Sequence, residues 1–474
     1  MRNKAYLLAL LAACGPIVSL AAAPGHMGSR LPSEKRMVID PVTGIPLTFL
    51  TSSPAGDSKI YQTHRQWTAD GKWVVFRSHR SPGQAFAVNE ATGAIVQVTE
   101  TGYMGMLCLA RLSMDLYIMR DMGHALNQGS RENTGAAGGA AQARAGDGGP
   151  RSGRGRPHGP FQIVDINLAA LIADSEAGTV RPAAHYERVC GTIASELNAN
   201  GNMGLDANED RMYFSIRSAD LAQRLPTGVK PAESFGPRGM GAGPSGLASM
   251  DLKTGEVKNI VAVPFQIGHV QTNPWVPGEI VFCWETGGKA PQRTWTVMAD
   301  GTGLRPLYRE APYEWVTHEA VITRDEVAIA IMGHRKPGTG VTEPDPWGPS
   351  GTREHPTGLG VVNLRTHEMR IIGQTASGSG LWHVNGSADG RWAVGDDFSR
   401  SIFLIDRRTG EMMMLSTGHK PTAADHPHPT FNASGTEIEI ESAMLSADDR
   451  SMNICIIPVP KTWLQRTYPN RVPE

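Results

Sequence analysis

The sequence is poor in cysteine and has almost no net charge. Its 474 residues include 5 Cys, and 45 Lys+Arg nearly balance 46 Asp+Glu to leave −1. The balance argues against partners bound by overall charge, such as nucleic acid or an anionic membrane. The cysteines beyond Cys14 are far apart and form no C-x-x-C pair, which argues against a disulfide framework and a thiolate zinc site. We expect them to be buried free thiols: Cys108, Cys190, Cys283 and Cys455.

Long apolar runs are absent except near the N-terminus. Residues 5–23 are almost wholly apolar, follow a short basic start and end before Pro24. This pattern is typical of an export signal over residues 1–23, processed either after a small residue near Ala23 or as a lipoprotein at Cys14. No second apolar span follows, so we expect no transmembrane span. The sequence therefore predicts an exported protein that is periplasmic, secreted or lipid-anchored.

Glycine and proline are abundant, with 54 and 33 residues, and they separate short runs typical of strands. These runs form an internal repeat. Its clearest copy is a strand, an Asp-Gly turn and a second strand over residues 67–76, and the pattern returns around residues 389–394. Hairpins with an Asp-x-x-Thr-Gly connection occupy a later part of the repeat, as at residues 251–255. Such a repeat predicts an all-β fold built from similar blades.

The repeat occurs seven times, with second strands expected at residues 73–76, 116–119, 212–215, 280–283, 327–331, 392–394 and 437–440. The seventh copy lacks a fourth strand, whereas residues 38–48 form a half-hairpin without first strands of its own. Pairing the two closes a ring and leaves no exposed strand edge. We predict a seven-bladed β-propeller over residues 36–462 whose last blade is completed by an N-terminal strand, followed by a tail at residues 463–474.

Histidines occupy one position of the repeat in five copies. His64, His383 and His428 each lie seven residues before the turn glycine, at the start of an innermost strand. His269 and His318 occupy the equivalent position in the fourth and fifth blades. A single histidine in such a place is more often held by a neighbouring loop. Five at one mouth of a central channel favour a shared site.

The spacing of these histidines favours a metal site. Prolines stiffen the segment that carries His426 and His428, and His318 lies two blades earlier. Three neutral imidazoles bind a divalent ion and leave positions open for substrate. His383 is then either a fourth metal ligand or a residue that contacts the ligands without binding the metal itself. His269 is the remaining imidazole, placed to act as a base near neutral pH.

Three inserts are expected on the same face of the ring, at residues 121–160, 218–245 and 335–357, where they would wall a cleft. The first contains a low-complexity tract rich in glycine and arginine. An RNA-binding tract is disfavoured in an exported protein, and an insertion without a tuned function is the favoured interpretation.

Several segments resemble motifs of a known family: Gly268-His269 with Phe282-Cys283-Trp284-Glu285, Thr317-His318-Glu319, Trp382-His383 with Val394-Gly395-Asp396, and His426-Pro427-His428-Pro429-Thr430-Phe431. They resemble the oligogalacturonate lyases, polysaccharide lyases with a seven-bladed propeller fold. The resemblance runs from about residue 38 to residue 460 and is strongest from Gly268 onward. It implies that His269 is the base and that His318, His426 and His428 hold a divalent cation. That cation is manganese in the family; Zn²⁺, Ca²⁺ and Ni²⁺ stay open.

The sequence departs from the family at three positions. The family's glutamine ligand falls on Ala423, and its catalytic arginine, just before the third strand of blade three, falls near Gly246. Arg217 or Arg238 is the candidate replacement for that arginine. A family histidine is Trp284 here, which suits stacking on a sugar. We expect further substrate contacts from His64, Arg293 and His334.

These features predict a metal-dependent lyase that cleaves oligogalacturonides or a related uronate glycan by β-elimination. Removal of the C5 proton requires a neutral imidazole, and a cation with an arginine must neutralise the adjacent carboxylate. Two alternatives stay open: a lyase for a different uronate glycan, and a propeller that binds glycans or partners without catalysis. A propeller-bearing serine peptidase is excluded by the absence of a G-x-S-x-G motif. The expected partner is an acidic oligosaccharide.

Overall fold

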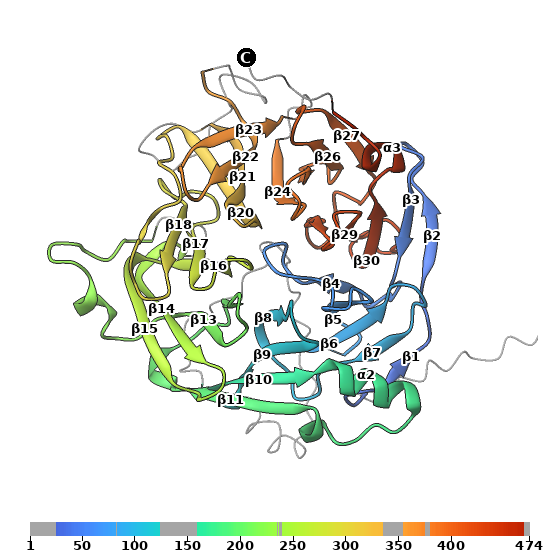
Figure 1. Cartoon of the computed structure of the whole chain (residues 1–474), viewed down its shortest axis with the longest axis horizontal. Helices are drawn as coiled ribbons and strands as arrows, with labels where there is room; N and C mark the ends of the chain where they lie inside the picture. Colours follow the sequence, from blue (N-terminus) through green and yellow to red (C-terminus); the bar gives the residue numbers. More distant parts are fainter. Residues whose placement is uncertain are drawn as a thin grey trace, which may run out of the picture.

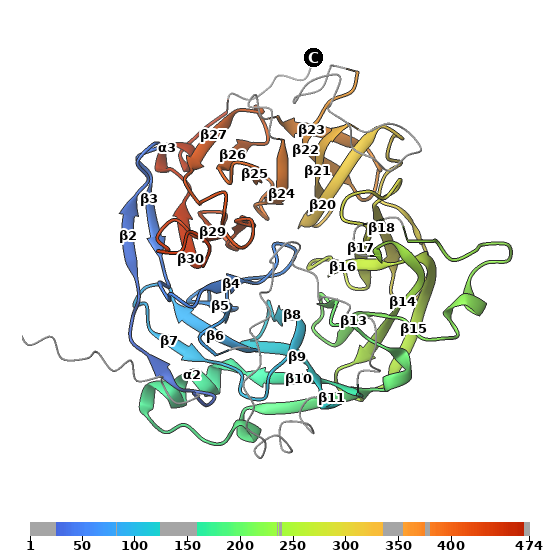
Figure 2. The ribbon, with the colours of Figure 1, turned by 180° about the vertical axis from the view of Figure 1, so that it is seen from behind.

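The computed structural model describes residues 25–81, 83–123, 159–234, 236, 239–334, 354–374 and 380–468. These residues form seven antiparallel sheets arranged as a ring (Figure 1). The predicted seven-bladed β-propeller is confirmed. Turned by 180°, the ring shows the same order of blades around its centre (Figure 2).

Four strands make up each of blades one to three, numbered from the innermost strand outward. They are β4 (Asp57–Lys59), β5 (Trp73–Ser78), β6 (Gln84–Asn89) and β7 (Ile95–Gln97); β8 (Met104–Leu109), β9 (Asp115–Asp121), β10 (Phe161–Asn167) and β11 (Glu187–Ile193); and β12 (Met203–Leu205), β13 (Arg211–Ile216), β14 (Ala242–Asp251) and β15 (Val257–Phe265). A short N-terminal strand, β1 (Arg30–Leu31), adds to the outer edge of blade one.

Blades four to six repeat this order. They contain β16 (Ile267–Thr272), β17 (Glu279–Trp284), β18 (Thr294–Met298) and β19 (Arg305–Pro306); β20 (Glu314–Thr323), β21 (Glu326–His334), β22 (Gly358–Asn363) and β23 (Met369–Gly373); and β24 (Leu381–Gly386), β25 (Trp392–Asp397), β26 (Ile402–Asp406) and β27 (Met412–Ser416). All seven expected second strands are present as β5, β9, β13, β17, β21, β25 and, in blade seven, β29.

Blade seven combines the two ends of the chain. It contains β28 (Thr430–Phe431), β29 (Glu437–Ser442) and β30 (Asn453–Pro458), to which the N-terminal β3 (Pro46–Phe49) and β2 (Arg36–Ile39) are added. Phe49 pairs with Cys455, and both side chains are fully buried. The predicted closure by an N-terminal strand is therefore confirmed, and β2 adds a fifth strand.

The Asp-Gly turns explain why the repeat is readable in the sequence. In blade one, Asp70 accepts hydrogen bonds from the Thr68 hydroxyl (2.6 Å) and the Lys72 N–H (3.1 Å). Gly71 then takes a positive φ of 71°, a conformation that costs glycine little. In blade six, Asp389 accepts in the same way from the Ser387 hydroxyl (2.6 Å). The turn is thus specified by local chemistry alone.

Some features of the fold were not expected. Helix α2 (Leu168–Ala177) connects β10 to β11, and it is capped by the side chain of Asn167. A short helix, α3 (Lys461–Leu464), buries Trp463 against Trp392 of blade six, so the start of the C-terminal tail packs on the ring. The cysteines at 108, 190, 283 and 455 are buried and free, as predicted. Among the described residues, no helix has the length and apolar character needed to cross a membrane.

The innermost strand of blade one is interrupted by a loop of residues 60–65, which we call the channel loop. Before it, Lys59 opposes Phe76; after it, Trp67 opposes Val74 and the Gln66 carbonyl accepts from Val75 N–H. Pairing therefore resumes in register once the six residues are skipped. Both views show this loop reaching into the centre of the ring (Figures 1 and 2).

Candidate active site

Four histidines from consecutive blades gather at the start of the innermost strands. His269 lies in β16, His318 in β20, His383 in β24, and His428 directly before β28. Their rings follow one another around the centre, with centroid distances of 5.8 Å from His269 to His318, 4.2 Å from His318 to His383 and 3.8 Å from His383 to His428. His426 joins them at 5.4 Å from His383.

Each of the four rings has its Nδ1 atom next to a protein oxygen. For His318 this is the Trp382 carbonyl (2.8 Å), for His383 the Asp396 carboxylate (3.1 Å) and for His428 the Glu441 carboxylate (3.4 Å). In the neutral ring, a proton on Nδ1 leaves Nε2 with a free lone pair. Histidines that bind a metal or accept a proton through Nε2 usually have their Nδ1 held by an oxygen acceptor in this way.

Burial keeps two of these imidazoles neutral. The pKa of His318 is well below its usual value because the ring is buried and neighbours other positive groups, His383 first among them. The pKa of His383 is also well below its usual value, since burial and His428 outweigh the attraction of Asp396. Neutral imidazoles are the form that ligates a metal.

His428 behaves differently because it lies among carboxylates. Burial alone would lower its pKa, but Asp425 and Glu441 outweigh that effect and raise it. The carboxylate of Asp396 is the opposite case: burial would raise its pKa, and His383 and His426 hold it well below its usual range. Negative charge is therefore retained deep in the site, where it can balance a bound cation.

His269 forms a separate network with blades four and five. Its Nδ1 lies 2.8 Å from Glu319, and its Nε2 lies 3.3 Å from Glu285. Arg293 donates from Nε to Glu319 (3.0 Å) and also lies 3.2 Å from His269 Nδ1. The buried Arg293 thus fixes Glu319, and Glu319 in turn orients the imidazole.

The backbone at His269 and His428 is strained. Their φ values are 48° and 51°, in the left-handed region that residues with a Cβ rarely adopt. At His269 the strain coincides with an irregularity in the pairing of β16 with β17. Such strain costs about 1–3 kcal/mol and occurs preferentially at functional sites.

The donor atoms fit a divalent cation. Among the residues that the structure describes, two clusters bring three ligand atoms within 4.8 Å of one another: His383, Asp396 and His426, and Asp425, His428 and Glu441. Nitrogen and carboxylate oxygen donors suit manganese, zinc and similar ions. The third such cluster is His269, Cys283 and Glu285. Burial raises the pKa of the Cys283 thiol well above its usual value, which disfavours the thiolate that a metal would need.

The structure thus brings together His269, His318, His383, His426 and His428, all named from the sequence. It separates His64, which lies on the channel loop and is bonded through Nε2 to the Met203 carbonyl (2.8 Å). The difference arises because the chain leaves the innermost strand at residue 60 and rejoins it only at Gln66.

Other predicted substrate contacts lie in varied surroundings. Trp284 stacks on Phe265, with centroids 4.9 Å apart, and donates from Nε1 to the Gly241 carbonyl. Arg293 is buried beside His269, and His334 is buried at the end of β21, 5.7 Å from the Tyr313 ring. Arg238 lies outside the described residues, as do Cys14 and most of the inserts at 121–160 and 335–357.

The arginine position of blade three differs from expectation. Gly246 lies within β14 opposite Ile216, not before the strand, because β14 already begins at Ala242. A Cβ at Gly246 would come within 2.7 Å of Leu221. Arg217 follows β13 directly. Burial lowers its pKa, and among the described residues no charged group offsets that effect.

Tyr61 is a member of the site that sequence reasoning missed. It lies on the channel loop, and its ring centroid is 4.9 Å from that of His269 and 5.2 Å from that of His428. Glu319, Glu285 and Asp396 lie within the motifs that resemble the family, but the sequence alone assigns them no role. Their position next to the histidines in these motifs is the sequence feature that could have identified them. Tyr61 lies outside every position of the repeat, so no sequence feature marks it.

Fold and site together define a propeller with a buried histidine and carboxylate centre at one end of its innermost strands. No protein-family model matches the chain, and no curated protein matches it. Among solved structures, an oligogalacturonate lyase in complex with manganese is similar, with a TM-score of 0.65 and 16% identity over 93% of this chain and 100% of that one. An oligogalacturonate lyase from Vibrio parahaemolyticus is also similar, with a TM-score of 0.63 and 15% identity over 92% of this chain and 100% of that one. At such identity the similarity is one of fold.

Proposed function

We propose that this protein is a metal-dependent polysaccharide lyase that cleaves oligogalacturonides or a related uronate glycan by β-elimination. The observation that carries the proposal is the set of histidines from blades four to seven whose Nδ1 atoms are all engaged by protein oxygens. The similarity in fold to oligogalacturonate lyases, one of them in complex with manganese, supports it.

In place of the set His318, His426 and His428 that the resemblance implies, the cation would be held by His383, His426 and Asp396, whose ligand atoms lie within 4.8 Å of one another, with His318 and His428 beside them. Bound there, a divalent ion would neutralise the uronate carboxylate next to the C5 proton. Asp396, as a buried carboxylate between two histidines, keeps the ligand set in place.

The proton would be taken by His269. Arg293 holds Glu319, and Glu319 would hold a proton on Nδ1, which leaves Nε2, 3.3 Å from Glu285, as the basic atom. Arg217 is the cation assigned to the substrate carboxylate, because its guanidinium is half-buried and has no charged partner among the described residues. The leaving glycosidic oxygen takes its proton from water.

A different uronate glycan is the second candidate. The observation that favours it lies directly before β14: residues 239–241 are Gly, Met and Gly, so none of these described residues carries a guanidinium. Recognition of the carboxylate would then differ from that of the family, even where the elimination chemistry is the same.

The test is incubation of the purified protein with oligogalacturonides and a panel of uronate glycans, with added Mn²⁺ or with chelator. We expect ultraviolet absorbance of an unsaturated product that depends on the metal. Replacement His269→Ala is expected to lower kcat by about 10²–10⁴-fold, the contribution of a general base. The exposed His79 provides the control His79→Ala, with unchanged rate.

Absence of product on every uronate would overturn the lyase assignment. A rate that survives His269→Ala would overturn His269 as the base. Activity that is indifferent to chelation would contradict an exchangeable metal.

A further inference from the structure

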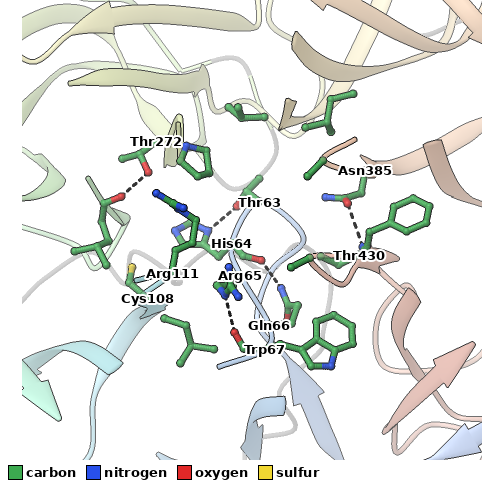
Figure 3. Close-up of a pocket in the computed structure, with 18 of the residues that line it drawn as sticks. Thr63, His64, Arg65, Gln66, Trp67, Cys108, Arg111, Thr272, Asn385 and Thr430 are labelled. Atoms are coloured by element: carbon green, nitrogen blue, oxygen red, sulfur yellow. Dashed lines mark hydrogen bonds between the residues drawn. The ribbon is translucent and has the colours of Figure 1, made fainter. Parts of the chain in front are cut away.

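A second cavity lies at the opposite end of the innermost strands from the histidines (Figure 3). Every blade begins with its innermost strand and continues outward, so the innermost strands run in the same direction. The histidines lie at or near the starts of these strands. The cavity is lined instead by residues at their ends, among them Leu109 of β8, Thr272 of β16, Ile322 of β20 and Gly386 of β24. Its volume of about 440 Å³ is in the range of small-molecule sites.

The channel loop lies between the two sites. Tyr61 contacts the histidine rings, whereas Gln62, Thr63 and His64 line the cavity. The loop is held on the cavity side by the Asn385 amide, which donates to the Gln62 carbonyl (3.0 Å). The cavity is thus a compartment distinct from the proposed active site.

Gln62 lies beside this cavity, but its amide is enclosed by the protein. Its side chain is buried, with 1% exposed, and neither its oxygen nor its nitrogen has a hydrogen-bond partner within the described part of the chain.

Two guanidinium groups also line the cavity without ion pairs to any described residue. Arg65 donates only to main-chain carbonyls, those of Trp67 (2.8 Å) and Thr68, and the exposed Arg111 side chain has no partner among the described residues. Burial lowers the pKa of Arg65, and so does the positive charge of Arg111, while the carboxylate of Glu209 raises it. Two neighbouring cations are stabilised by an anion that contacts both of them.

The carboxylates of the cavity wall are already engaged. Asp206 accepts from Asn208 N–H, Gly278 N–H and the Tyr213 hydroxyl. Glu209 accepts from the N–H groups of residues 111 and 112 and from the Ser113 hydroxyl. The free hydrogen-bonding capacity of the cavity therefore belongs mainly to the two guanidinium groups.

We propose that this cavity binds a hydroxylated carboxylate of monosaccharide size, such as a free hexuronate. Arg65 and Arg111 would hold the carboxylate. In Figure 3, Asn385 and Thr430 lie across the cavity from the two arginines, where they can reach the far side of such a ligand. Trp275 and Phe431 add apolar surface of the kind on which a sugar ring packs. The choice of a uronate as the probe rests on the proposed function. The charge and size expected of the ligand rest only on the arginines and on the volume of the cavity.

The test is isothermal titration calorimetry of the full chain, in the presence of chelator, with galacturonate, with galactose as the neutral match, and with sulfate as a simple anion. We expect saturable binding of galacturonate, at least tenfold weaker binding of galactose, and weaker binding of sulfate. Arg111→Gln is expected to weaken galacturonate binding by about tenfold or more, the loss of one charge-assisted hydrogen bond. Arg111 makes no side-chain bond to described residues, so this variant should fold; the exposed Arg309 provides the control Arg309→Gln.

His269→Ala separates the two sites, because it lies in the proposed active site and should leave this binding unchanged. No saturable binding, equal binding of galactose or sulfate, no effect of Arg111→Gln, or loss of binding in His269→Ala would each overturn the proposal. Failure of the lyase assay with intact galacturonate binding would overturn only the proposed function.

Discussion

At the scale of single residues, the neighbours of each histidine set its charge. His318 and His383 are neutral because they are buried among other positive groups, whereas His428 is surrounded by Asp425 and Glu441 and holds a proton more readily. Rings whose centroids lie within 4.2 Å of each other can therefore have pKa values that are shifted in opposite directions. That difference supports a site in which some imidazoles ligate a metal and the charge is balanced by carboxylates.

Outside this site, the buried His419 is expected to make the stability of the fold depend on pH. It is fully buried between the hydroxyls of Ser416 (2.8 Å) and Ser442 (2.7 Å), and burial lowers its pKa to about 4 from an unfolded value of 6.5. Above pH 6.5 neither state binds the proton. As pH falls from 6.5 towards 4, only the unfolded chain binds it, so stability falls by up to about 1.4 kcal/mol per pH unit.

His419→Gln is therefore expected to flatten the pH dependence of stability between pH 6.5 and 5 by about that slope, measured by urea unfolding. The exposed His79 gives the matched control, His79→Gln, with an unchanged slope. Parallel pH profiles for His419→Gln and the natural protein would contradict the assignment.

At the scale of elements, the channel loop is an addition to an otherwise regular strand. Lys59 opposes Phe76 before the loop and Trp67 opposes Val74 after it, so the pairing is displaced by the six residues 60–65. Six is an even number, so the alternation of side chains is also preserved across the loop. The loop places Tyr61 against the histidines without disturbing blade one.

This arrangement predicts the effect of deleting residues 60–65. Lys59 would be joined to Gln66, and β4 would continue in register through Trp67. We expect a folded propeller by far-ultraviolet circular dichroism, destabilised by about 3 kcal/mol or more through the loss of the buried Ile60 and Tyr61.

The control replaces the same six residues by glycine and serine. It loses the same contacts and also has to order a flexible loop, so its melting temperature should lie below that of the deletion variant. A deletion variant that fails to fold, or that melts below the control, would contradict the assigned register.

At the scale of the whole molecule, the ring is closed by strands from opposite ends of the chain. β3 pairs with β30, and Leu47 and Phe49 enter the core shared with Trp392 and Ile457. Without β3, β30 would present an open edge that favours pairing with another molecule. Closure also keeps the two ends of the innermost strands, and with them the histidine site and the second cavity, in one rigid frame.

Removal of residues 1–50 is therefore expected to abolish a single cooperative thermal transition and to produce soluble aggregates. Each fully buried apolar side chain lost contributes about 1.5–3 kcal/mol, and Leu47 and Phe49 are both of this kind. The measurements are thermal circular dichroism and size-exclusion chromatography with light scattering. Removal of residues 1–24 serves as the control, with an unchanged transition; a monomeric, cooperative 51–474 fragment would contradict the role of β3.

Much of the fold was predictable because the turns are local. Asp70 with Gly71 and Asp389 with Gly390 specify the same tight turn wherever they occur, and the alternating runs beside them specify strands. That periodicity predicts the number of blades and the closing strand. It also predicts that His269, His318 and His383 lie near the same end of the central channel. Arg217 and Arg238 could not be ranked in the same way, because they lie beside or within an insert that has no periodic pattern.

The repeat in the amino-acid sequence was enough to establish a closed ring of seven blades and a gathering of histidines at one mouth. Only the tertiary structure shows that Glu319 and Asp396 are the partners of His269 and His383. It also shows that the channel loop keeps His64 apart from the other histidines and brings Tyr61 next to them. The second cavity likewise exists only in the folded ring. The physical reason is distance along the chain: turns and strands depend on residues a few positions apart, whereas these contacts join segments from different blades and exist only once the ring is closed.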